Sequence, residues 1–141
     1  MIFAKGTILP DEQLPQVLQQ LPEELIAVRS QPPLAPRVVI DACQRLLERL
    51  DRGELDALIA QYATPQLLSA LEQYRHLLRP ESLEYKLSVE TGGLLSVEER
   101  PFGRTAAVPL GTLLHVTAGN LDGLPAFSVV DGLLNGNVNL L

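Results

Sequence analysis

The chain has 141 residues, a net charge of −6 and a single cysteine, Cys43. Its length fits one domain, and its acidic balance leaves no basic stripe for phosphates, which argues against a nucleic-acid-binding protein. No apolar run approaches the roughly 20 residues of a membrane helix, and the first residues lack the apolar core of a signal peptide. A lone cysteine excludes an internal disulfide, so we expect a cytoplasmic protein.

The first third of the chain predicts short elements followed by a proline-rich linker. Residues 2–9 favour a short extended piece with a turn at Lys5-Gly6. Asp11 can cap a helix whose apolar residues reach Leu21, although Pro15 makes that helix short or delays its start. A second helical piece is expected from Pro22 to Val28. Three prolines in residues 31–36 indicate a linker.

Three helices are predicted next. The strongest runs from about Arg37 to Leu50, with its apolar residues on one stripe. Gly53 breaks it, and residues 55–62 form another apolar stripe. Thr64-Pro65 supplies a capping hydroxyl followed by proline at the first helical position, and this helix is expected to end before Pro80.

The apolar period then changes from 3.6 to 2, which predicts strands. Leucine, tyrosine, leucine and valine alternate with polar residues over 83–89, as in a half-buried strand. Thr91-Gly92-Gly93 is typical of a turn, and Leu94–Arg100 reads as a returning strand. The sequence therefore predicts a β-hairpin within residues 81–103.

The C-terminal third predicts a βαβ unit. An apolar strand, Leu110–Val116, is followed by the small polar turn Thr117-Ala118-Gly119-Asn120 and by a helix over 123–134. Asn135-Gly136 is a helix stop, and residues 137–141 form a second strand. Such strands are normally parallel, and ligands bind beyond their carboxyl ends, which here means Thr117–Asn120. Few residues after Pro101 are charged, so we expect this third to be the first part of a larger α/β domain.

This pattern resembles the aldehyde dehydrogenase superfamily. The shared features are Pro109-x-Gly111, an apolar strand ending in a small-residue turn with Asn120, and Gly136-Asn137 before an apolar run. The segment HVTAGN, followed by LLNGNVNLL, is most similar to the acyl-CoA reductase (LuxC-type) branch. The resemblance implies an α/β fold: a helical N-terminal region (1–80), a β-hairpin (81–103) and a truncated dinucleotide-binding domain (104–141).

The resemblance also implies site residues. Asn120 would donate its amide to the oxyanion, and Thr117, Ala118 and Gly119 would form the floor under the cofactor, NADPH or NADH. A lysine is expected directly after Leu141, and the nucleophilic cysteine well downstream. The substrate would be a fatty acyl-CoA or another acyl thioester, and the enzyme a homo-oligomer whose hairpin contributes contacts.

Each candidate residue also has a simpler, structural interpretation. Asn120 and its small neighbours also suit a simple strand-ending turn. His115 favours a core histidine over a catalytic base, and His76 a solvent-facing side chain. Cys43 lies on the apolar stripe of an early helix and is expected to be buried rather than nucleophilic. Two histidines and one cysteine make no zinc site, so no metal is expected.

The full expectation is the N-terminal part of an NAD(P)H-dependent fatty acyl-CoA reductase that forms aldehyde through a cysteine thioester and is inactive as this piece alone. Two alternatives remain open. One is an aldehyde dehydrogenase running the oxidation, and the other is a small module whose helical stripes over 37–78 bind a partner protein.

Overall fold

The computed structural model describes residues 2–4, 6–92, 97–116 and 124–141. The chain divides into two compact units, Met1–Pro32 and Pro33–Leu141. The boundary falls inside the proline-rich stretch 31–36, where the structure has no regular element before Pro36, so the predicted linker is confirmed.

The first unit is a small hairpin followed by one long helix. Strands β1 (Ile2–Ala4) and β2 (Thr7–Leu9) pair antiparallel, with Gly6 between them at a φ of 79°. A 3-10 turn, η1 (Asp11–Gln13), leads into α1 (Leu14–Arg29), so the helix does start later than Asp11. The predicted break at Pro22 is wrong. Val17, Leu21 and Leu25 continue one half-buried stripe at a spacing of four across the proline.

The second unit begins with three helices at the predicted places. They are α2 (Pro36–Asp51), α3 (Asp56–Tyr62) and α4 (Pro65–Leu77). Thr64 caps α4, because its hydroxyl oxygen accepts the Leu67 backbone N–H at 3.0 Å. The chain turns between α2 and α3 at Gly53, which has a φ of 72°.

The strand predicted over residues 83–89 is wrong, because Pro80–Thr91 forms helix α5. Leu83 and Leu87 are four residues apart and both pack in the core, whereas Tyr85 and Val89 are 71% and 65% exposed. The alternating pattern thus contains a helical pair facing inward and a second pair facing outward. Pro80 opens this helix, and Gly92 closes it with a φ of 64°.

The β-hairpin lies later than expected. Strands β3 (Val97–Arg100) and β4 (Gly103–Ala106) pair antiparallel with Arg100 opposite Gly103. Residues 97–100 belong to the predicted returning strand, but their partner follows them in the chain instead of preceding them. The predicted division into domains at 1–80, 81–103 and 104–141 stays a prediction.

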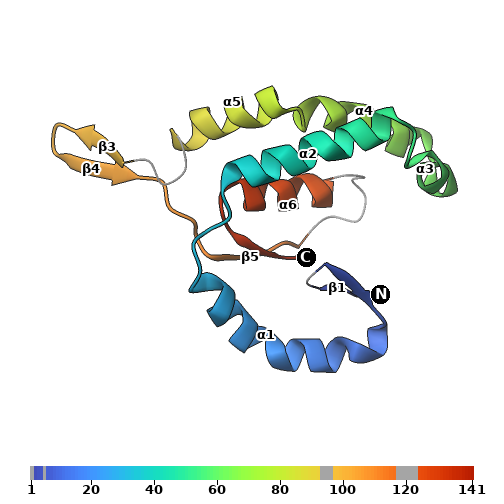
Figure 1. Ribbon diagram of the computed structural model, residues 1–141, viewed down its shortest axis with the longest axis horizontal. Helices are drawn as coiled ribbons and strands as arrows, with labels where there is room; N and C mark the ends of the chain where they lie inside the picture. Colours follow the sequence, from blue (N-terminus) through green and yellow to red (C-terminus); the bar gives the residue numbers. More distant parts are fainter. Residues whose placement is uncertain (1, 5, 93–96, 117–123) are drawn as a thin grey trace. The chain divides into compact units, whose positions relative to one another are not determined.

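The predicted βαβ unit is confirmed. Strand β5 (Thr112–Leu114) is followed by α6 (Leu124–Leu134) and by β6 (Val138–Leu140), and the two strands pair parallel. In Figure 1, α6 lies between α2 and the β5–β6 pair, and it contacts both α2 and β6. The strands are shorter than predicted, but helix α6 and the position where it ends match the prediction closely.

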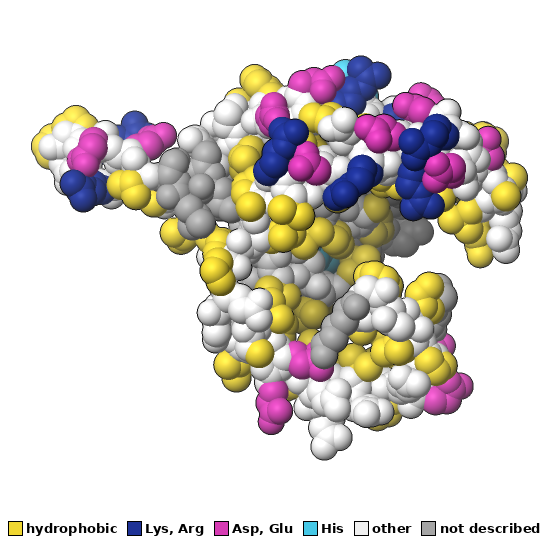
Figure 2. Space-filling model, viewed as in Figure 1, with side chains coloured by type: hydrophobic (Ala, Val, Ile, Leu, Met, Phe, Trp, Pro, Cys, Tyr) yellow, Lys and Arg dark blue, Asp and Glu magenta, His cyan; other side chains and the backbone are white. Residues whose placement is uncertain are grey.

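One small core joins α2, α5 and α6. Its buried members are Val39, Ile40, Cys43, Leu83 and Leu134, of which Leu134 is fully enclosed. Figure 2 shows positive and negative side chains interspersed over the α2–α5 surface, in keeping with ion pairs such as Arg37–Glu84 at 3.0 Å. Mixed helices and small sheets agree with the predicted α/β class. Within the described residues no helix combines the length and apolarity needed to cross a membrane.

Candidate functional site at the carboxyl ends of the parallel strands

The residues predicted to form the site follow directly after β5. Thr117, Ala118, Gly119 and Asn120 lie outside the residues that the structure describes. Their roles therefore stay predictions, but the elements on either side of them are described. Strand β5 leads into this segment and helix α6 follows it.

The carboxyl ends of the two parallel strands lie side by side. Leu114 is in register with Leu140, and the His115 backbone N–H donates to the Leu140 carbonyl at 2.7 Å. At the other end, the Val138 N–H donates to the Gly111 carbonyl at 2.8 Å. Pairing therefore extends one residue beyond each end of β5, and the segment with Asn120 leaves from the edge where α/β sheets bind ligands.

Helix α6 ends in a Schellman motif that starts β6. The Gly136 N–H donates to the Leu133 carbonyl and the Asn137 N–H to the Gly132 carbonyl, both at 2.9 Å. Gly136 has a φ of 72°, the left-handed conformation that this motif requires and that glycine adopts without steric cost. The helix stop predicted at Asn135-Gly136 is thus confirmed.

Two asparagines then anchor the strand pair. Asn137 is buried, and its Oδ1 accepts the Gly111 N–H at 3.0 Å. Asn139 donates from Nδ2 to the Asn137 carbonyl at 3.0 Å and presents Oδ1 to His115 Nε2 at 2.7 Å. A buried amide without partners would be costly, so these bonds explain why asparagine is compatible with a strand here.

His115 has a partner on each ring nitrogen. Its Nε2 meets Asn139 Oδ1, and its Nδ1 lies 2.7 Å from Ser128 Oγ on α6. The side chain is half-buried. Its partners come from α6 and β6 and not from its own strand, and the interpretation of His115 as a core histidine rather than a catalytic base stays a prediction. Sequence reasoning missed Ser128 and Asn139; the alternation of asparagine at 135, 137 and 139 was the available signal.

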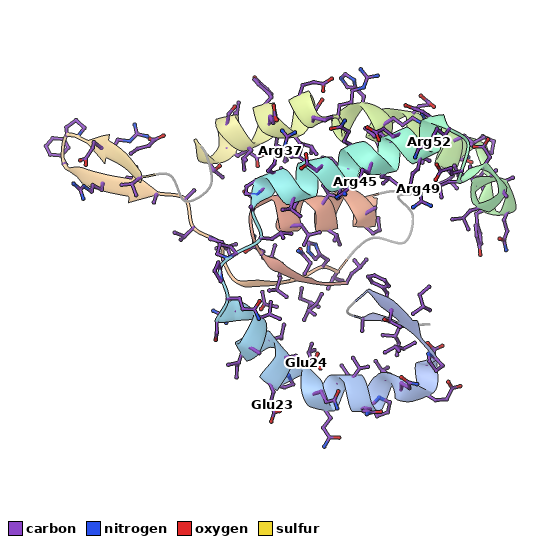
Figure 3. The ribbon with its side chains drawn as sticks, in the orientation of Figure 1. Glu23, Glu24, Arg37, Arg45, Arg49 and Arg52 are labelled. Carbon is purple, nitrogen blue, oxygen red and sulfur yellow. The ribbon has the colours of Figure 1, made fainter. Side chains whose placement is uncertain are left out.

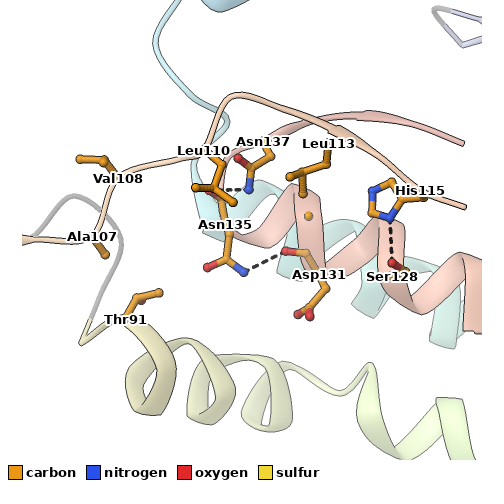
Figure 4. A pocket seen from close by; sticks show the side chains of 11 residues that line it. Thr91, Ala107, Val108, Leu110, Leu113, His115, Ser128, Asp131, Asn135 and Asn137 are labelled. Atoms are coloured by element: carbon orange, nitrogen blue, oxygen red, sulfur yellow. Dashed lines mark hydrogen bonds between the residues drawn. The ribbon is translucent and has the colours of Figure 1, made fainter.

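Beside this network lies a cavity of about 340 Å³ (Figure 4). Its polar wall includes His115, Ser128 and Asp131, and Asn135 donates from Nδ2 to the Asp131 carbonyl at 2.9 Å. Leu110 and Leu113 supply apolar lining. The cavity therefore offers both hydrogen-bonding and apolar contacts alongside β5.

Lys86 of α5 is held against α6. Its Nζ lies 3.0 Å from Glu90 and 3.2 Å from Asp131, and 5.6 Å from the ring centre of Phe127. Burial acts to lower the pKa of Lys86, but hydrogen bonds and charge attraction from Glu90 and Asp131 outweigh it and raise the pKa above its ordinary value. Lys86 is therefore a charged link between two helices and not a neutral base.

The other candidate groups occupy structural or exposed positions. Cys43 is buried in the core, as expected, and this burial raises the pKa of its thiol, which disfavours a nucleophilic role. His76 is exposed, as expected. Across the described ranges no three histidine, cysteine or acidic side chains are grouped so that they could hold a metal ion.

The arginines of α2 do not form a free anion site. Figure 3 shows Arg37, Arg45 and Arg49 along this helix and Arg52 directly after its end. Arg37 Nε pairs with Asp41 at 2.8 Å, while Arg49 and Arg52 both bind Glu54, at 2.8 and 2.6 Å. These carboxylates neutralise most of the positive charge that a phosphate would need.

Comparison with known proteins identifies the family of the chain. Searches of curated proteins and of solved structures found no match. A family model described as acyl-CoA reductase (LuxC) matches residues 37–141, which begin with α2 and include the whole βαβ unit. Because that match spans well over half of the sequence, the chain belongs to the LuxC family of acyl-CoA reductases.

Proposed function

We propose that this chain is the N-terminal part of an NAD(P)H-dependent fatty acyl-CoA reductase, which reduces an acyl thioester to an aldehyde through a cysteine thioester. Membership of the LuxC family supports reduction of an acyl-CoA as the kind of reaction. The same membership favours the reductase over an aldehyde dehydrogenase working in the oxidative direction. We further propose a homo-oligomeric cytoplasmic enzyme.

In the proposed reaction a cysteine thiolate attacks the acyl-CoA carbonyl, and the carbon–sulfur bond to CoA breaks. The Asn120 amide stabilises the oxyanion that forms on this carbon, because a neutral N–H donor lowers the energy of developing negative charge. A nicotinamide cofactor, when bound, would supply the hydride that converts the enzyme thioester to aldehyde. Thr117, Ala118 and Gly119 would let the cofactor approach the backbone, since their side chains are small.

The observation that carries this proposal is the parallel pairing of β5 with β6. The bond from the His115 N–H to the Leu140 carbonyl brings the carboxyl ends of both strands together. Asn120 follows His115 by five residues in the sequence and precedes α6. This topology supports a dinucleotide and thioester site beyond the strand ends, as in other open α/β sheets.

The nucleophile must come from outside these 141 residues, because the sequence contains one cysteine and that cysteine is buried. Burial raises the pKa of the Cys43 thiol, whereas a nucleophilic cysteine needs a lowered pKa and access to substrate. Leu114 and Val116, which are 73% and 90% exposed, also support a further part of the enzyme over β5. Parallel sheets are normally covered on both faces.

The test is to assay the enzyme that contains this sequence with a fatty acyl-CoA and NADPH, following cofactor oxidation and aldehyde together. We expect equal amounts of NADP⁺ and aldehyde, and an acyl group covalently bound to a cysteine when NADPH is omitted. Cys43→Ser should retain turnover. Aldehyde formation without a trapped acyl-cysteine, or loss of turnover in Cys43→Ser with normal folding, would contradict the proposed mechanism.

A further inference from the structure

The turn that ends α6 contains an Asn-Gly dipeptide, Asn135-Gly136, which is chemically reactive in a flexible chain. The backbone nitrogen that follows an asparagine can attack the side-chain amide carbon and form a five-membered imide. Glycine permits this attack best, because it has no Cβ to obstruct the approach and adopts backbone angles that other residues avoid. Whether the dipeptide reacts therefore depends on how the fold holds it.

The folded turn holds both reacting groups in hydrogen bonds. The Gly136 N–H donates to the Leu133 carbonyl at 2.9 Å, so the attacking nitrogen is engaged at the helix end. The Asn135 Nδ2 donates to the Asp131 carbonyl at 2.9 Å, which holds the amide against the preceding helical turn (Figure 4). Both bonds must break before the Gly136 nitrogen reaches the Asn135 Cγ.

Opening this turn also disturbs the core. Leu134 directly precedes Asn135 and is fully enclosed, and it belongs to the same buried cluster as Ile40 of α2. Leu133 packs against that cluster as well. Unwinding the last turn of α6 therefore withdraws apolar side chains from the core, so the packing of the core controls how often the turn opens.

We propose that Asn135 is a modification site, which deamidates when the last turn of α6 opens and is protected while it is closed. In the open turn the Gly136 nitrogen loses its proton to solvent and bonds to Asn135 Cγ. The Cγ–Nδ2 bond then breaks, and ammonia leaves with a proton taken back from solvent. Water adds to either carbonyl of the imide and gives aspartate or isoaspartate. Asn135 lines the cavity beside β5, so water reaches this position.

The product cannot rebuild the turn as it was. The new carboxylate lies at the C-terminus of a helix, where negative charge is unfavourable, and four residues after Asp131, which carries the same charge. Lys86 is already shared by Glu90 and Asp131. Isoaspartate also adds an atom to the backbone and so breaks the spacing of the Schellman motif. Deamidation therefore loosens the start of β6 irreversibly.

The first experiment compares deamidation in the folded full-length protein and in guanidinium chloride at one mildly alkaline pH, by peptide mapping with mass spectrometry. In denaturant Asn135 should convert much faster than Asn137 and Asn139, which precede the larger residues Val138 and Leu140. In the folded protein Asn135 should convert at least about a hundredfold more slowly, because only the open fraction reacts.

Two results of that experiment would overturn the proposal. Equal rates for Asn135 in the folded and denatured protein would show that the turn gives no protection. Conversion of Asn137 or Asn139 as fast as Asn135 in denaturant would show that the Asn-Gly dipeptide is not the reactive site.

Ile40→Val tests the link to the core. Ile40 is 3% exposed, and loss of one methyl group should speed conversion in the folded protein roughly two- to tenfold while leaving the rate in denaturant unchanged. Val38→Ala is the matched control, because Val38 lies on the exposed side of α2 and should leave both rates unchanged. An unchanged folded rate in Ile40→Val would overturn the coupling to the core. Complete absence of conversion in both folded proteins, over an incubation long enough for the expected rate, would overturn the modification site.

Asn135→Asp tests the consequence directly. This substitution should lower the midpoint of urea unfolding more than the neutral Asn135→Gln. The effect of Asn135→Asp should be smaller in an Asp131→Asn background, because the repulsion between the two carboxylates is then absent. The acidic form that ion exchange separates from aged folded protein should also have a lower Tm. An unchanged midpoint in Asn135→Asp together with an unchanged Tm of the aged form would contradict the predicted loosening of β6.

Discussion

Gly132 and Asn139 approach each other so closely that no larger residue than glycine fits at position 132. A Cβ on Gly132 would lie 1.9 Å from Asn139 Oδ1 and 2.9 Å from its Cγ. The Asn139 amide cannot easily move aside, because His115 and the Asn137 carbonyl hold its two ends. This contact leaves no room for a Cβ on Gly132 unless the Asn139 side chain moves.

Gly132→Ala is therefore expected to destabilise the protein. In an ordinary helix interior this substitution stabilises by up to about 1 kcal/mol, but overpacking costs about 1–3 kcal/mol. The midpoint of urea unfolding should fall in Gly132→Ala. Adding Asn139→Ala should relieve the overlap, so the double variant should lose less than the sum of the single changes. A raised midpoint in Gly132→Ala would show that the close approach does not exist.

Cys43 should react slowly with thiol reagents in the folded protein. Its burial raises the thiol pKa above the ordinary 9.0, so the thiolate fraction at neutral pH is reduced in addition to the loss of access. The labelling rate should keep rising with pH beyond that ordinary value. The control is Cys43→Ser combined with Gln44→Cys, which places a thiol on the exposed neighbouring position. Equal labelling rates for the two thiols would contradict the burial of Cys43.

The Lys86–Asp131 contact should give a pH-dependent contribution to stability. The folded-state pKa of Lys86 lies above 10.5, its ordinary value, so the stabilisation is complete below that pH and is lost as the pH rises through the folded-state pKa. Lys86→Met should lower the free energy of unfolding by at most about 1 kcal/mol at pH 7.5, because the group is partly exposed.

That difference should shrink at pH 11, when Lys86 begins to lose its proton. Arg104→Met is the comparison, because Arg104 pairs with Glu99 at 2.8 Å and arginine stays charged at this pH. The measurement is urea unfolding of all three proteins at both pH values. If the loss of unfolding free energy caused by Lys86→Met grew with pH, the contacts assigned to Lys86 would be contradicted.

Asn120→Ala in the full-length enzyme should lower turnover by about 10²–10³-fold, the usual effect of removing one oxyanion donor. The affinity for NADPH should change little, because this amide meets charge that develops only in the transition state. Asn120→Asp should be worse, since a carboxylate repels that charge. Steady-state kinetics beside a thermal melt provide the measurement, and near-normal turnover in Asn120→Ala would reduce Asn120 to a turn residue.

The sequence by itself determined the elements whose signals are local. The Thr64 cap with Pro65, the apolar stripe of α2 and the Asn135-Gly136 stop all depend on residues within one or two turns, and each is present as predicted. The order of strand, helix and strand in the C-terminal third was predicted in the same way. The residues of this unit also carried the resemblance to acyl-CoA reductases, which the family match over 37–141 supports.

Tertiary packing decided the features for which the local sequence pattern allowed more than one structure. Leu83, Tyr85, Leu87 and Val89 fit both a strand and a helix, and the core beside Val39 and Leu134 selects the helix because it accommodates only Leu83 and Leu87. The partners of His115 were likewise hidden, since Ser128 and Asn139 are 13 and 24 residues away in sequence. Such contacts exist only after α6 folds back onto β5 and β6, because hydrogen bonds between elements depend on distances that no local spacing specifies.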